Sequence, residues 1–170
     1  MNRLEQLADR IERLSEWSGR AVSWLTLAMV LVTFLVVVLR YAFDLGWIAL
    51  QESITWMHAL VFLLGAAYTL RHDGHVRVDI FYRKRSPRGR AWTDLLGALL
   101  LLIPVCGFIL WISWDYVAES WRLHEGSREA GGLPGVFLLK TAIPVMATLL
   151  LVQGLAQVLR SIAVIRRGKR

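Results

Sequence analysis

Long uncharged stretches are the feature that most limits what this chain can fold into. A helix needs about 20 consecutive apolar residues to cross the ~30 Å hydrocarbon layer of a bilayer. Three stretches without a charged residue approach that length: 21–39, 95–114 and 141–159. A fourth, 47–70, is long enough but includes polar residues. The sequence therefore predicts an all-α integral membrane protein with four transmembrane helices.

The expected division of the chain is an arm helix, 1–19, a membrane domain, 20–165, with spans at about 21–43, 47–70, 92–115 and 141–160, and a basic tail, 166–170. We expect the first span to be retained rather than cleaved as a secretory signal. Its apolar run is longer than that of a signal, and Arg40 and Tyr41 follow it instead of small residues. The single cysteine, Cys106, lies in the third span, so no internal disulfide can form.

The distribution of basic residues predicts the orientation. The N-terminal segment, the second connection and the C-terminal tail together carry 16 Lys and Arg residues, and the other two connections carry 4. Because basic residues stay on the cytoplasmic side, both termini and the 71–90 segment are expected in the cytoplasm. Attraction to anionic membrane lipids then explains the net charge of +7 without a nucleic-acid partner.

The N-terminal segment has an apolar stripe at helical spacing, formed by Leu4, Leu7, Ile11 and Leu14. Charged residues occupy the other faces of this expected helix. Such a stripe is buried either in the membrane interface or against another helix. We expect an amphipathic helix that lies in the inner membrane interface, and packing on another helix is the alternative.

The second span carries a polar face. One side of the expected helix displays Gln51, Thr55, His58, Phe62 and Gly65. Polar groups are costly in hydrocarbon unless they have partners, so this face should meet protein rather than lipid. We favour a contact with another helix or another subunit.

Glu52 lies about 100° from that face and near the outer end of the span, where Arg40 is a plausible partner. The competing hypothesis is an autonomous proton-coupled transporter with an ion relay through Glu52 and His58. Their side chains point about 120° apart on a helix, which does not favour a shared site.

Metal, haem and enzymatic sites are not expected. Bis-histidine haem ligation would need a second histidine at membrane depth besides His58, so a haem or quinone subunit is a weaker hypothesis. His72 and His75 have the spacing of a helical metal pair, but Gly74 between them indicates that the helix ends there. We expect His75 and Asp79 to fix the following loop by hydrogen bonds.

The connection before the last span is longer than necessary. We expect the third helix to continue through 116–124 and to end at 125–127, and the glycine-rich 131–135 to form a turn. Pro104 and Pro144 are expected to kink their helices.

A string of residues resembles a known family. It comprises Arg40-Tyr41-x-Phe43, Trp47, Gln51-Glu52 and then Leu64-Gly65-Ala66-Ala67-Tyr68-x-x-Arg71-x-x-Gly74-His75-Val76-Arg77-Val78-Asp79. This pattern is similar to the small (DctQ-type) permease subunit of tripartite ATP-independent periplasmic (TRAP) transporters, over nearly all of 20–160. The family often has an acidic pair where Gln51 and Glu52 stand, so no carboxylate role is carried over to position 51.

The resemblance implies a non-catalytic subunit of the bacterial inner membrane, without cofactor or metal. It implies a large permease (M) subunit that holds the substrate and sodium sites, and a periplasmic solute-binding (P) receptor that delivers an organic acid. The substrate itself stays open. The candidates for subunit contact or structural support are Arg40, Trp47, Gln51, Glu52, His58, Arg71, His75, Arg77 and Asp79.

Overall fold

The computed structural model describes residues 3–76 and 79–167. Its helices are α1 (Arg3–Ala42), α2 (Ile48–Arg71), α3 (Asp79–Tyr82), α4 (Pro87–Gly97), the π-helix η1 (Ala98–Leu102), α5 (Ile103–Arg122) and α6 (Val136–Arg167). Four helical rods are long and apolar enough to cross a membrane: α1, α2, the continuous α4–η1–α5 and α6. The prediction of an all-α chain with four helical rods long and apolar enough to span a membrane is confirmed for the residues that the structure describes.

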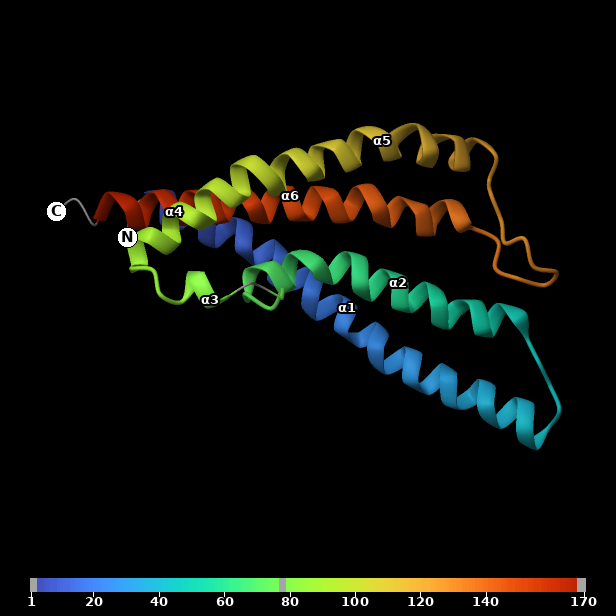
Figure 1. The fold of residues 1–170 in the computed structure, drawn as a ribbon. Helices are drawn as coiled ribbons and strands as arrows, with labels where there is room; N and C mark the ends of the chain where they lie inside the picture. The colour runs from blue at the N-terminus through green and yellow to red at the C-terminus, as the bar shows by residue number, and fades with distance from the viewer. Residues whose placement is uncertain (1–2, 77–78, 168–170) are drawn as a thin grey trace.

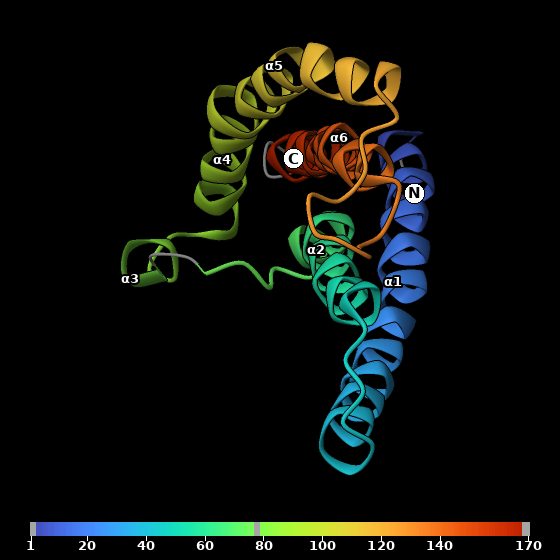
Figure 2. The same ribbon diagram turned by 90° about the vertical axis from the view of Figure 1, so that its right-hand side faces the viewer.

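Helix α6 lies at the centre of the molecule and packs on α1, α2, α4 and α5 (Figure 1). Figure 2 shows α1 and the α4–α5 rod on different sides of α6, with α2 beside α1. Buried small residues of α6, such as Ala147 and Ala156, permit the close approach. At Gly154, an added Cβ would lie 2.8 Å from a methyl carbon of Leu102.

Helix α1 joins two parts that the sequence suggested as separate. The expected arm and the first span form one uninterrupted helix of 40 residues. At 1.5 Å per residue this helix is about 60 Å long, roughly twice the hydrocarbon thickness. Gly19 lies inside this helix without breaking it. Its lack of a side chain makes room for the Tyr68 ring of α2, which lies where a Cβ would be. Figure 1 shows the long α1 crossing the other helices at an angle.

The third rod bends around α6 at a π-helical segment. Pro104 has no backbone N–H, so it cannot complete the regular hydrogen-bond pattern of the helix. One residue earlier, Ile103 donates its N–H to the carbonyl of Ala98, five positions back. The predicted disturbance at Pro104 therefore takes the form of a π-helical turn, η1.

Helix α2 ends at Arg71, at the start of the basic 71–90 segment. Asp73 adopts a left-handed backbone conformation, with φ of 54°. The N–H of Gly74 bonds to the carbonyl of Thr69 at 2.9 Å, and that of Asp73 bonds to Leu70 at 3.2 Å. This pair of bonds is the Schellman end of a helix, with Asp73 in the position that glycine usually takes. Gly74 follows it, close to where the sequence predicted the end.

Candidate functional site

The polar face of α2 points away from the rest of the chain. Gln51, Thr55 and His58 are all exposed, and so is Phe62. None of the three polar side chains has a hydrogen-bond partner among the residues that the structure describes. We call Gln51, Thr55 and His58, with Phe62, the α2 outer face.

Thr55 shows most clearly that this face is incomplete. Threonines in membrane helices satisfy their hydroxyl by bonding to the carbonyl four residues earlier. Thr33 of α1 does so with Met29 at 2.7 Å, and Thr69 of α2 does so with Gly65 at 3.0 Å. Thr55 makes no such bond within the described part of the chain. His58 lies about 15 Å from the start of α2, near the middle of a span.

Glu52 lies beside the α2 outer face but belongs to another cluster. Its carboxylate accepts hydrogen bonds from the Ser127 hydroxyl and, at 2.7 Å, from the Leu133 N–H. The expected pairing with Arg40 is wrong: Arg40 is an exposed residue near the end of α1, and the outer loop provides the partners of Glu52. Glu52 therefore ties α2 to the connection between α5 and α6.

The outer loop, residues 123–135, is folded around this carboxylate. Ser127 donates its N–H to Leu133 at 3.0 Å and closes the loop on itself. A Cβ on Gly132 would lie 2.8 Å from a Glu52 carboxylate oxygen, so only glycine fits there. Gly131 and Gly135 have positive φ, as the predicted turn requires. As predicted, the preceding helix extends to Arg122 and ends in the following few residues.

A second carboxylate secures the other side of the outer loop. Glu125 accepts from Lys140 at 2.5 Å and from the Ser120 hydroxyl at 2.7 Å. The bond from Lys140, together with that from Ser120, holds the pKa of Glu125 below its ordinary value. Lys140 also lies 4.0 Å from the centre of the Tyr116 ring. The outer loop is thus fixed to both α2 and α6.

At the opposite end of the molecule, an acidic stripe on α1 faces basic residues of α2 and α6. The stripe consists of Glu5, Asp9, Glu12 and Glu16. Glu5 pairs with Arg167 at 2.5 Å, and Asp9 pairs with Arg160 at 2.9 Å. These ion pairs hold the N-terminal half of α1 against the bundle.

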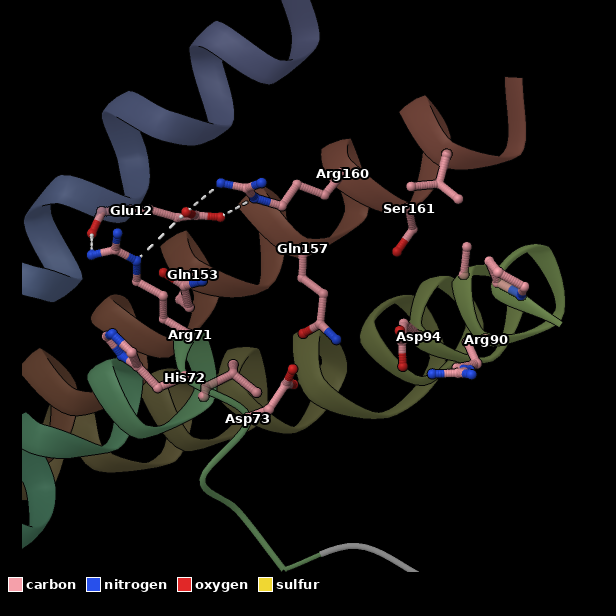
Figure 3. A pocket seen from close by; sticks show the side chains of 14 residues that line it. Glu12, Arg71, His72, Asp73, Arg90, Asp94, Gln153, Gln157, Arg160 and Ser161 are labelled. Atoms are coloured by element: carbon pink, nitrogen blue, oxygen red, sulfur yellow. Dashed lines mark hydrogen bonds and ion pairs between the residues drawn. The ribbon is translucent and has the colours of Figure 1, made fainter. Parts of the chain in front are cut away.

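Glu12 is the centre of this ionic cluster. It is only 6% exposed, and its carboxylate binds Arg160 through two oxygens, one of them at 2.6 Å from Nη2. Arg71 donates to the carbonyl oxygen of Glu12 at 3.0 Å and to the Glu16 carboxylate at 2.5 Å. One arginine from each of two helices therefore converges on α1, as Figure 3 shows for Glu12, Arg71 and Arg160.

Within the described part of the apolar stripe of α1, Leu7 and Leu14 face outward and Ile11 is half-buried. Trp17 is 70% exposed, and Leu7 and Leu14 are exposed as well. The helix thus contacts the bundle with its polar face and leaves the apolar one uncovered. The prediction for this segment used its apolar periodicity. The acidic residues repeat at the same helical period, with spacings of four, three and four, and this pattern could have predicted the ionic cluster.

The remaining predicted residues occupy separate places. Trp47 precedes α2 and is exposed, and the ring Nε2 of His75 lies 3.2 Å from the carbonyl oxygen of Ala66. Arg77 lies outside the described residues, and Asp79 is the first residue of α3. Within the described residues, no group of three or more potential metal ligands occurs.

A cavity of about 610 Å³ lies next to the ionic cluster. It is lined by Glu12 of α1, by the ends of α2 and α4 and by α6, and Figure 3 shows its polar side chains. Gln153 is buried in its wall and accepts a hydrogen bond from Ser15 at 2.7 Å. This cavity was not predicted, because its residues come from four distant segments of the sequence.

Comparison with known proteins places these features in context. A family model described as "Tripartite ATP-independent periplasmic transporters, DctQ component" matches residues 29–164. Over 93 residues the chain is 33% identical to a Haemophilus influenzae protein named "Putative TRAP transporter small permease protein". That match covers 55% of this chain and 56% of the relative. No solved structure gives a significant match.

Proposed function

We propose that this chain, which belongs to the DctQ family of TRAP transporter components, is the non-catalytic scaffold for a large permease subunit. The α2 outer face is the surface that would meet this partner. Unsatisfied polar groups within a span favour protein contact over lipid, because hydrocarbon offers them no hydrogen bond. The Thr55 hydroxyl, which lies within a spanning helix and has no partner among the described residues, is the observation that carries the proposal.

The wider role follows from the same proposal. The large subunit would hold the substrate and sodium sites, and a periplasmic receptor would deliver an organic acid. The chain would lie in the bacterial inner membrane with both termini in the cytoplasm, as its basic residues indicate. Glu12, Glu52, Arg71 and His75 would keep the scaffold in shape rather than touch substrate.

Affinity purification from the native membrane tests the scaffold role. A tagged chain should recover a large multi-span protein. Replacing Thr55→Leu together with His58→Leu should reduce that recovery about ten-fold or more, since the interhelical hydrogen bonds would be lost. The matched control is Thr33→Leu, which alters an exposed threonine of α1 that is already satisfied by Met29.

Two results would contradict the proposal. One is full recovery of the large partner by the α2 double variant. The other is substrate transport by this chain alone in liposomes that is abolished by Glu52→Gln, which would establish the autonomous transporter instead.

A further inference from the structure

A groove of about 400 Å³ lies on the third rod, where α4 passes into η1. It is lined by Arg85, Trp92, Thr93, Leu96, Gly97, Leu100 and Leu101. Ala91 and Leu95 pack against Ile165 of α6, whereas the leucines of the groove are exposed. Figure 2 shows α4 on the side of α6 away from α1. The groove therefore lies on a side of the rod that neither α6 nor α1 covers.

The wall of this groove is apolar and open. Leu100 and Leu101 are each 67% exposed, and a Cβ added at Gly97 would meet no described atom within 4 Å. The missing side chain at position 97 therefore adds free space between the leucines. Beyond Thr93, the groove presents no hydrogen-bonding side chain among the described residues. Such a surface suits a hydrocarbon chain, unlike the α2 outer face with its polar groups.

Arg85 is held against the polar end of the groove. Its Nη1 donates to the Thr93 hydroxyl at 2.6 Å, and that hydroxyl donates to the carbonyl of Gly89 at 2.9 Å. The Arg85 side chain passes over Gly89, where an added Cβ would lie 3.3 Å from its own Cβ. Both partners are neutral, so they do not cancel the positive charge. Because a guanidinium has five N–H groups, most of its donors remain available to an anion.

Two further cations lie beside Arg85. Lys84 and Arg88 are exposed, and neither forms an ion pair with a described residue. Ser86 caps α4 by accepting the N–H of Gly89 at 3.2 Å, which fixes the turn that carries them. No carboxylate lines the groove among the described residues. This end of the groove therefore favours an anionic group.

The polar and apolar parts follow one another along the rod. From Thr93 to Leu100 the helix rises by about 10 Å, from the bound guanidinium to the exposed leucines. Trp92, at the level of Thr93, is exposed, as indole rings often are at the depth of lipid head groups. An anionic head at one end and an apolar chain beyond it are the parts of an anionic phospholipid.

We propose that this groove binds one anionic phospholipid, with its phosphate at Arg85 and one acyl chain along Leu96, Leu100 and Leu101. Lys84 and Arg88 add to the attraction for the phosphate. A zwitterionic phospholipid would bring its own cation close to these positive side chains, so it should bind less tightly. The site is independent of the scaffold role and of the α2 outer face.

Native mass spectrometry of the chain, purified in mild detergent with any partner it retains, tests the charge preference. We expect one phosphatidylglycerol per chain, bound about ten-fold more tightly than phosphatidylcholine of equal chain length. Arg85→Gln should weaken phosphatidylglycerol binding about five-fold, and Arg85→Lys should preserve most of it. Arg13→Gln is the matched control, because Arg13 is an exposed arginine of α1 that forms no ion pair with a described residue.

The acyl-chain part of the site is tested by filling the groove. Gly97→Leu should weaken phosphatidylglycerol binding about five-fold or more, since the new side chain takes the place of the lipid chain. Gly107→Leu makes the same change farther along the rod, where a Cβ also meets no described atom within 4 Å. The groove at Gly107 is lined by Asp115 instead of an arginine, so this variant should bind phosphatidylglycerol as the natural chain does.

A photoreactive residue at Leu100 in native membranes separates lipid from a partner helix. We expect lipid adducts from this position. An adduct with a protein would assign the groove to a partner and overturn the proposal. Equal binding of the two lipids by the natural chain, no retained lipid, or an equal loss with Arg13→Gln and Arg85→Gln would each overturn it as well.

Discussion

Single residues at the two ends of the bundle connect segments that lie far apart in the sequence. Glu52 joins α2 to the outer loop through Ser127 and Leu133, and Glu12 joins α1 to α6 through Arg160. The sequence showed that Glu52 would need a partner in the membrane. It could not show which partner, because a hydroxyl and an N–H some 75 to 81 positions away carry no local signal.

The ionic cluster should make a measurable contribution to stability. Glu12→Gln removes a buried charge on which Arg160 depends, so we expect the free energy of unfolding to fall by about 2 kcal/mol. Thermal unfolding of the purified protein in detergent, followed by circular dichroism, measures this loss. Glu119→Gln is the control, because it removes a carboxylate of the exposed Glu119–Arg122 pair, and it should leave the unfolding temperature unchanged. Equal effects of both changes would argue against a central role for Glu12.

Glu125 should make the stability of the outer loop depend on pH. Its pKa is lower in the folded protein than in the unfolded chain, because Lys140 and Ser120 bond to the carboxylate. The stabilisation is therefore complete above the ordinary value of 4.5 and is lost as the pH falls through the lowered folded pKa. Unfolding temperatures of the natural chain and of Glu125→Gln, measured from pH 7 to pH 3, should differ at neutral pH and converge in acid. A constant difference would contradict this.

At the scale of elements, hydropathy indicated the four spans but not their true lengths. The polar residues of 3–20 gave no span signal, and the continuity of α1 depends on ion pairs with α2 and α6 that only the fold brings together. The π-helical turn η1 likewise follows from Pro104 and from packing against α6, whereas the sequence indicated only a disturbance.

The uncovered apolar stripe of α1 should lie in the membrane interface. In liposomes that contain only this chain, Leu14→Cys should react with a membrane-impermeant maleimide at least about ten-fold more slowly than Arg13→Cys. Cys106 is buried and serves as the unreactive background. Because no partner protein is present, slow labelling of position 14 would have to come from lipid. Equal rates at the two positions would show that the stripe lies in water.

At the scale of the whole molecule, the two ends of the helix bundle differ in both charge and structure. One end carries the ionic cluster and the basic residues of 83–90, and the other carries the outer loop around Glu52. Family, span number and the exposed polar face were all predictable from the sequence. The cavity beside the ionic cluster was not, since it exists only where α1, α2, α4 and α6 meet.

This asymmetry predicts the orientation in the membrane, which accessibility to a labelling reagent tests directly. Arg128→Cys should be labelled by an impermeant maleimide in intact cells whose outer membrane has been permeabilised, and Arg88→Cys should be labelled only after lysis. Both positions are exposed in the structure, so access rather than burial decides the result. The opposite pattern would invert the proposed topology.

Docking of a large subunit on the α2 outer face is the central claim, and site-specific photo-crosslinking in native membranes tests it most directly. A photoreactive residue is placed at Thr55 or, as a control, at the exposed Trp111 of α5. The account predicts an adduct of this chain with one large membrane protein from position 55, and lipid adducts alone from position 111. A protein adduct from position 111 together with none from position 55 would contradict it.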